Sequence, residues 1–279
     1  MTFRMTSRLA GAALIAAILQ PAGPALAADQ AAASSPDLSW VKTDERLWPL
    51  GMFEQENLVK KRPKAPFDLT GTWTLTRQPE TGGFNFLPLP KLKPRAQALY
   101  DEGVKANAEG KAFMDDTGAC WPAGMPKWWT RVWPIQIMQY PTGIVMIQGL
   151  FNAARWIYTD GRGHMNPELR EPTYNGDSIG RWEGDTLVVD TVGFQPKRHW
   201  VMQGVPVSDQ FHIVERIKMN PEKKAFTVEF IMTDPENWEG EWRNTKQMGP
   251  VKGEDVVESH CLPDLNDHLP ATHADHNER

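Results

Sequence analysis

The sequence predicts a mainly β protein, folded as an antiparallel barrel or a sandwich, with one helix and a long tryptophan-rich loop. Three observations support this prediction. Short segments of alternating apolar and polar residues recur after position 130, turn-forming residues separate them, and one segment alone has the start and stop signals of a helix. Hydrophobic residues make up 41% of the 279-residue chain and aromatic residues 10%, which is enough to form a core and excludes wholesale disorder.

The first 27 residues have the three parts of a secretory signal peptide. Arg4 and Arg8 form a basic start, Leu9–Leu19 is a short apolar run, and residues 25–27 are a small-residue cleavage site. Cleavage would remove two of the 30 basic residues and none of the 35 acidic ones, which leaves 252 residues with a formal charge of −7. We expect a periplasmic or secreted protein without a membrane span, and its acidity argues against a nucleic-acid partner.

The mature chain is predicted to have three parts. Residues 28–65 form an extended arm or linker, because they are rich in Ala and Ser, then charged, and have no sustained periodicity. Residues 66–263 form the β-rich domain, and residues 264–279 form a polar tail. The domain opens with a half-buried strand within Phe67–Thr76. The helix follows over Pro94–Gly110, where Pro94 suits the first turn and Gly110 the end.

An irregular, aromatic-rich loop is predicted over Asp115–Pro134, which holds Cys120 and four of the twelve tryptophans. Strands are predicted after it, with a bulge or turn at Gly184-Asp185 inside the fourth of them. Their ranges are Ile135–Gln139, Gly143–Phe151, Arg155–Thr159, Gly180–Thr191, Phe211–Lys218 and Phe226–Met232.

Cys120 and Cys261 are the two cysteines of the chain, and each is followed by a proline two positions later. In an oxidising compartment such a pair is most simply a disulfide, and a nucleophilic thiolate is the alternative. Neither cysteine has a ligand-spaced Cys or His beside it, and the chain has no phosphate loop or dinucleotide glycine pattern. We therefore expect neither a metal nor a cofactor.

The string GRWEGDTLVVDT over residues 180–191 resembles a signature of a large family of exported bacterial proteins. The family is common in acidobacteria and proteobacteria, and most members have no assigned activity. Residues 157–162, 176–179, 212–217 and 234–235 and both cysteine neighbourhoods also resemble it, so the similarity covers roughly Phe67 to Cys261. One departure is Glu241, where the family pattern has a proline before tryptophan. Separately, Gly71-Thr72-Trp73 is similar to the opening strand of lipocalin-like barrels, which implies a calycin-like barrel.

Asp160, Arg162 and His164 form the first candidate site. An acid, a forked donor and an imidazole within five residues could orient a carboxylate ligand or act in acid–base chemistry. The alternative is a turn at Asp160-Gly161 with a local Asp–Arg pair.

Arg181, Glu183 and Asp185 form the second candidate site, beside Trp182. Their spacing of two places them on one face of a strand, where the two carboxylates could face a pocket. The alternative is a solvated strand end with an Arg–Glu pair.

Glu215 is the third candidate, because it shares the period of Phe211, Ile213 and Ile217. If that face is the interior, Glu215 is a carboxylate in apolar surroundings that needs a partner. If the other face is the interior, His212 and Arg216 are the pocket pair. Periodicity does not choose between these alternatives, and a buried structural ion pair is a third.

His199 lies in a loop and could pair with Asp209, or the loop could be merely mobile. Trp128 and Trp129 could line an apolar pocket or simply fill the core.

Three readings of the function follow from these residues. The first is binding of a small apolar or aromatic ligand in a barrel pocket, with the tryptophan-rich loop as its lid. The alternative is a cofactor-free lyase, isomerase or hydrolase in which Glu215 or His212 acts as base and Arg216 or Arg162 holds the anion. An envelope interaction protein is a third, structural reading. The sequence makes no prediction of the oligomeric state.

Overall fold

The computed structural model describes residues 35–44, 50–78, 82–111, 113, 118, 120–222 and 224–261. The predicted signal peptide and the polar tail from residue 264 therefore lie outside the described residues, as do residues 28–34 of the arm. Contacts divide the chain after Asp37, and the description below concerns the unit that begins at Leu38. No described helix is long and apolar enough to cross a bilayer.

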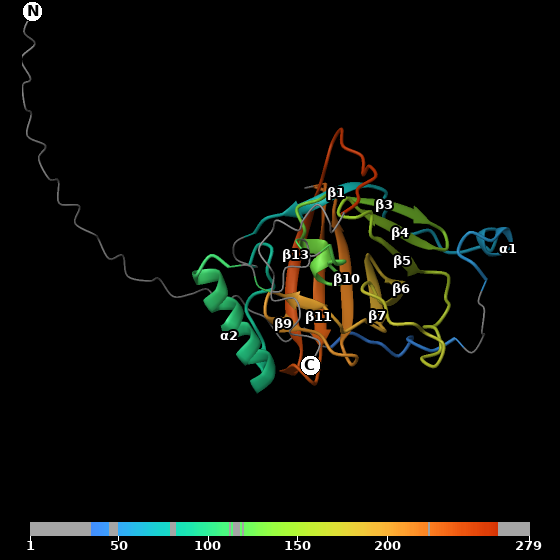
Figure 1. Ribbon diagram of the computed structural model, residues 1–279. Helices are drawn as coiled ribbons and strands as arrows, with labels where there is room; N and C mark the ends of the chain where they lie inside the picture. Colours follow the sequence, from blue (N-terminus) through green and yellow to red (C-terminus); the bar gives the residue numbers. More distant parts are fainter. Residues whose placement is uncertain are drawn as a thin grey trace, which may run out of the picture. The chain divides into compact units, whose positions relative to one another are not determined.

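The strands close into a barrel in the order β1-β13-β11-β10-β7-β6-β5-β4-β3, so the barrel expectation is confirmed (Figure 1). Closure removes free sheet edges, because β1 pairs with both β13 and β3. The bounds are β1 Gly71–Thr76, β3 Ile135–Tyr140, β4 Gly143–Gln148, β5 Ala154–Tyr158, β6 Asp177–Glu183, β7 Thr186–Val192, β10 His212–Asn220, β11 Ala225–Thr233 and β13 Trp242–Pro250.

Smaller elements are not part of the barrel wall. Strand β2 pairs with β12 and β8 pairs with β9. The bounds are α1 Gln55–Leu58, β2 Lys91–Leu92, α2 Pro94–Ala108, the 3-10 helix η2 Lys127–Thr130, β8 Trp200–Met202, β9 Val205–Pro206 and β12 Trp238–Glu239. Helix α2 agrees with the predicted helix to within two residues, and its Ala106 packs on Phe113 and Trp200.

Strands β5 and β6 are the exception to antiparallel pairing. They run parallel and share only two paired positions, Ile157 with Ser178 and Tyr158 with Ile179. A parallel pair needs a crossover in place of a tight hairpin. Residues 159–176 make this crossover, and several of them line the side pocket described below.

The predicted strand over Gly180–Thr191 is two strands, because Gly184 turns the chain with a φ of +59°. Strand β13 was not predicted. Its inward side chains are Trp242, Asn244, Lys246 and Met248, so polar residues stand on both faces and the apolar–polar alternation is lost.

Trp128 and Trp129 belong to the hydrophobic core, and both side chains are completely buried. They sit in η2, and the ring of Trp129 packs edge-on against Phe226 with centroids 6.1 Å apart. The Gln148 side chain donates a hydrogen bond to the Trp128 carbonyl. These two residues therefore fill the core, which was the alternative to lining an apolar pocket.

The outer face of the barrel carries an apolar patch that the N-terminal arm covers. Leu38 and Trp40 pack on Val188, Val214 and Ile231, which are the outward residues of β7, β10 and β11. Burial of the arm on these strands removes apolar surface from water.

The predicted disulfide between Cys120 and Cys261 is present, with the two Cα atoms 5.4 Å apart. It joins the tryptophan-rich loop to the segment that follows β13, 141 positions later in the sequence.

Candidate functional site

A buried ion pair lies inside the barrel between Arg155 of β5 and Glu215 of β10. The side chains are 1% and 0% exposed. The Arg155 guanidinium donates to both carboxylate oxygens, at 2.9 Å from Nη1 to Oε1 and through Nη2 to Oε2. Trp129 Nε1 also donates to Oε1 at 2.6 Å. Glu215 is therefore on the inner face, as one of the sequence alternatives supposed.

The remaining donors of Arg155 reach two hydroxyl groups. Nε and Nη2 lie 3.3 and 3.1 Å from Ser178 Oγ, and Nη2 lies 3.1 Å from Thr191 Oγ1. A buried charge is tolerated when it is paired and hydrogen-bonded, and each of the three guanidinium nitrogens of Arg155 and both carboxylate oxygens of Glu215 have a partner. These contacts agree with the alternative of a buried structural ion pair.

His212 and Arg216 point outward, because alternate residues of β10 face opposite sides. Arg216 Nη1 lies 3.2 Å from Glu183 Oε2, and Arg181 Nη2 lies 2.8 Å from Glu183 Oε1. Glu183 thus bridges two arginines on the barrel surface, which agrees with the solvated alternative for this group.

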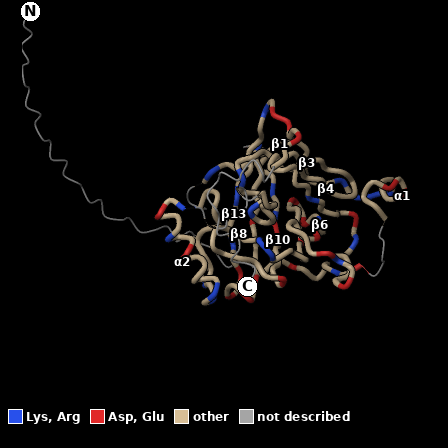
Figure 2. The backbone as a smooth tube through the Cα atoms, in the orientation of Figure 1, with Lys and Arg blue, Asp and Glu red and all other residues tan. Residues whose placement is uncertain are grey.

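The expected common face of Arg181, Glu183 and Asp185 is broken by the turn at Gly184. Asp185 pairs with Lys218 at 2.9 Å, and it is not aligned with the other two. Trp182 points the other way and packs edge-on against Phe67, with ring centroids 4.7 Å apart. Figure 2 shows that basic and acidic residues are interspersed over the barrel, so these pairs belong to a mixed surface.

Asp160 and Arg162 form a local pair, with Arg162 Nη2 2.7 Å from Asp160 Oδ2. Arg162 also donates to the Leu50 carbonyl at 2.5 Å, and Asn57 Nδ2 donates to Asp160 at 2.8 Å. Burial by itself would raise the pKa of Asp160, but the hydrogen bonds from Arg162 and Asn57 outweigh it and hold the pKa below its usual value. The pair anchors the segment around α1 to the crossover.

His164 is separated from that pair and lies in a chain of four titratable side chains. Nδ1 is 3.0 Å from Asp177 Oδ2, and Nε2 is 2.8 Å from Asp190 Oδ1. The second Asp190 oxygen lies 2.6 Å from His212 Nε2. The chain therefore runs Asp177–His164–Asp190–His212, from the crossover side of the barrel wall to an imidazole that is 29% exposed.

The geometry sets the protonation state of His164. A carboxylate only accepts hydrogen bonds, so both ring nitrogens must carry hydrogen for both bonds to form. Burial alone would lower the pKa of His164, but the bonds to Asp177 and Asp190 outweigh it and raise the pKa above 6.5. The imidazolium in turn helps to hold the pKa of Asp190 below its usual value, against the effect of burial.

His199 is buried and does not pair with Asp209. Its Nε2 lies 2.7 Å from the Met125 carbonyl oxygen, and its Nδ1 lies 3.0 Å from that of Gln195. The ring therefore ties its own loop to the tryptophan-rich loop.

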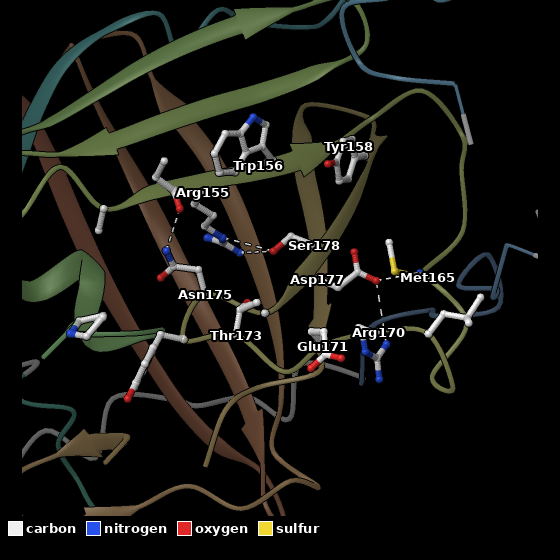
Figure 3. A pocket seen from close by; sticks show the side chains of 16 residues that line it. Arg155, Trp156, Tyr158, Met165, Arg170, Glu171, Thr173, Asn175, Asp177 and Ser178 are labelled. Atoms are coloured by element: carbon white, nitrogen blue, oxygen red, sulfur yellow. Dashed lines mark hydrogen bonds and ion pairs between the residues drawn. The ribbon is translucent and has the colours of Figure 1, made fainter. Parts of the chain in front are cut away.

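A pocket of about 790 Å³ opens at the wall between β5 and β6 (Figure 3). Trp156 and Tyr158 of β5 lie on one side of it, and Asp177 and Ser178 of β6 lie on the other. The crossover adds Met165 and Leu169, with exposed fractions of 40% and 47%, beside Trp156 at 45%. Arg155 and Ser178 also line the pocket, so the buried ion pair supports its inner wall.

Asp177 links the pocket to the four-residue chain. Its Oδ2 accepts from His164 and from the Met165 backbone N–H at 2.9 Å, and Arg170 Nη1 is 3.9 Å away. Among the described residues, no hydrogen bond reaches Asp177 Oδ1. Sequence reasoning missed Met165 and Leu169 as pocket residues because no periodic pattern marks a crossover segment. It missed Trp156, which lies in β5, because alternation does not show which face of a strand borders a pocket.

The predicted site residues do not line this pocket themselves, but four of them contact its lining. His164 bonds to Asp177 and Glu215 bonds to Arg155. The ring of His199 lies against Tyr174, and the Arg162 guanidinium lies over the ring of Tyr158. In the part of the chain that the structure describes, no three His, Cys, Asp or Glu side chains are grouped to hold a metal ion. Comparison with protein-family models and with curated proteins gives no match for this chain.

Proposed function

We propose that this protein binds a small apolar or aromatic molecule in the side pocket between β5 and β6. One observation carries the proposal: the pocket of about 790 Å³ gathers Trp156, Met165 and Leu169, three of the large hydrophobic side chains that the protein leaves exposed. Ligand sites are typically pockets of this size, with apolar walls and a few placed polar groups. Exposed apolar side chains that gather in one place mark a binding surface more often than scattered ones do.

Two polar groups are available to orient the ligand. The free Oδ1 atom of Asp177 accepts a hydrogen bond, and the Tyr158 hydroxyl group donates one. Burial raises the pKa of Tyr158, which keeps this hydroxyl protonated. Arg155 and Ser178 are already fixed by the buried ion pair, so the inner wall is organised before the ligand arrives, and that lowers the cost of binding.

The compartment belongs to the same proposal. The signal-peptide pattern and the Cys120–Cys261 disulfide support export to the periplasm or beyond the cell, where disulfides persist.

Native mass spectrometry on protein purified from a periplasm tests the proposal, followed by denaturing release of any bound molecule. We expect a stoichiometric small molecule whose affinity falls at least about tenfold in Trp156→Ala, since truncating a buried aromatic anchor removes a major share of the binding energy. The matched control is Phe53→Ala, an exposed aromatic residue outside the pocket, which should leave the affinity unchanged. Equal loss in both variants would contradict the proposal.

A cofactor-free lyase, isomerase or hydrolase is the second candidate. The hydrogen-bonded chain from Asp177 to His212 favours it, because a carboxylate at the pocket wall is backed by an imidazole. If the protein is an enzyme, the wild type converts the released compound, and Asp177→Asn binds that compound without converting it. If the protein only binds, the mass of the compound stays the same after incubation with the wild type or with Asp177→Asn.

A further inference from the structure

A second pocket, of about 620 Å³, lies beside the turn between β3 and β4. The segment from Leu58 to Asp68 forms one side, and Gln139, Tyr140 and Pro141 at the turn between β3 and β4 form the other. None of its lining residues belongs to the side pocket or to the chain from Asp177 to His212.

The sequence explains why this pocket is basic. Residues 60–66 read Lys-Lys-Arg-Pro-Lys-Ala-Pro, and a residue that precedes proline is pushed into extended backbone. Lys60 and the continuous run from Arg62 to Asp68, which includes Lys64, line the pocket, whereas Lys61 does not.

Arg62 is held in place by a buried asparagine. Its Nη1 and Nη2 donate to the carbonyl and side-chain oxygens of Asn57 at 2.7 and 2.5 Å. Asn57 is 3% exposed and donates in turn to Asp160, which pairs with Arg162. The Asp160–Arg162 pair therefore has a structural role: it holds Asn57, and Asn57 positions the Arg62 guanidinium at the second pocket.

The positive charge of the pocket is not neutralised from within. Asp68 is its one carboxylate, and Asp68 Oδ1 accepts from the Thr70 backbone N–H at 2.8 Å. In the described part of the chain, neither Lys60 nor Lys64 has an ion-pair partner. The full chain has a net formal charge of −5, whereas this pocket is lined by three cations and one carboxylate. The pocket is therefore locally positive and would attract an anion.

Aromatic rings complete the lining. Phe67 and Tyr140 lie in the pocket wall, and Tyr140 is supported by an edge-on contact with Phe53 at 4.9 Å between centroids. We infer that this pocket binds a small aromatic anion, an arene that carries a phosphate or carboxylate group. The anionic group lies against Lys60 and Lys64, and the ring packs against Tyr140 and Phe67. This inference does not depend on the function proposed for the side pocket.

Isothermal titration calorimetry with phenyl phosphate tests the inference on the purified full mature chain. We expect saturable one-site binding that weakens with added salt, because exposed charges are screened. The double variant Lys60→Gln/Lys64→Gln should lose affinity about tenfold, the size expected for two lost charge-assisted contacts. Lys61→Gln is the control and should change the affinity less than about twofold, because it removes one positive charge from the same segment at a position outside the pocket.

Two further ligands separate ring recognition from charge alone. Phenol keeps the ring without the charge, and inorganic phosphate keeps the charge without the ring, so both should bind more weakly than phenyl phosphate. Absence of saturable binding, or equal loss in Lys61→Gln and the double variant, would overturn the inference. Trp156→Ala should leave the affinity for phenyl phosphate unchanged, because Trp156 does not line the second pocket. Loss of binding in Trp156→Ala would place phenyl phosphate in the side pocket and would also overturn the inference. Failure of the side-pocket proposal leaves all of these expectations unchanged.

Discussion

Arg155 and Glu215 face each other inside the barrel although they are 60 positions apart in the sequence and stand on strands separated by β6 and β7. Their contact spans the lumen and ties together opposite parts of the wall. Because the pair also supports the inner wall of the side pocket, the stability of the fold and the shape of the candidate site depend on the same two charges.

Glu215→Gln should destabilise the protein by about 3–5 kcal/mol, because it leaves the buried Arg155 guanidinium without its counter-charge. Chemical denaturation followed by far-ultraviolet circular dichroism measures the change. The double variant Arg155→Met/Glu215→Met should recover most of the loss, since two apolar side chains need no partner. If the single variant is as stable as the wild type, the ion pair is not the structural element described here.

Stability should fall as the pH rises above neutrality, because of His164. Its pKa is raised in the folded protein above the 6.5 of the unfolded chain, so the folded state binds the proton more tightly. The stability that this contributes is complete below about pH 6.5 and is lost as the pH rises through the folded-state pKa. The contribution of Asp190 to stability has the opposite pH dependence, because its pKa is lowered in the folded protein. This contribution is lost as the pH falls through a folded-state pKa below 3.8.

Denaturant titrations between pH 5.5 and 8.5 test this expectation, and His164→Gln should flatten the decline. The comparison with His260→Gln separates the effect of this site from that of removing any histidine, because His260 is 67% exposed and its ion-pair partner among the described residues is the exposed Glu258. The charged groups near the His164 ring are Asp177, Asp190 and, beyond them, Arg170 and His212. An unchanged pH profile in His164→Gln would show that the imidazolium assignment is wrong.

Replacing both Cys120 and Cys261 with serine should cost about 2–5 kcal/mol, because the bridge closes a long loop in the unfolded chain. The reduced wild-type protein should match the double serine variant in a thermal melt. A melting temperature that does not respond to reduction would contradict a stabilising role for the bridge.

Gly124→Ala should destabilise the tryptophan-rich loop by about 2 kcal/mol or more. The backbone φ there is +65°, and an added Cβ would lie 2.3 Å from His199 Nε2, which must give up its bond to the Met125 carbonyl. Gly184→Ala is the matched control, because its φ is +59° but open space surrounds it. It should cost only the conformational penalty of about 1 kcal/mol. Similar losses at the two positions, measured by denaturation, would contradict the packing described for His199.

Local patterns predicted most of the wall of the barrel. The strands from β3 to β7 and the pair β10 and β11 follow alternation and turn residues, and helix α2 follows from its proline start and glycine end. Strand β13 escaped prediction because Asn244 and Lys246 face inward, where the pattern requires apolar residues. Lys246 is satisfied there by the carbonyls of Gly83 and Asn85, which lie far away in the sequence, and burial lowers its pKa to about 8.

The sequence by itself determined the fold class, the positions of most barrel strands and of helix α2, the cysteine pair and the short list of charged candidates. Only the tertiary structure decided that Glu215 faces inward, that Asp185 leaves the face of Glu183, and that the pocket belongs to Trp156 and the crossover. The physical reason is that alternation specifies two faces of a strand without naming the inner one. Barrel closure makes that choice, through contacts such as Arg155 with Glu215 that join residues far apart in the chain.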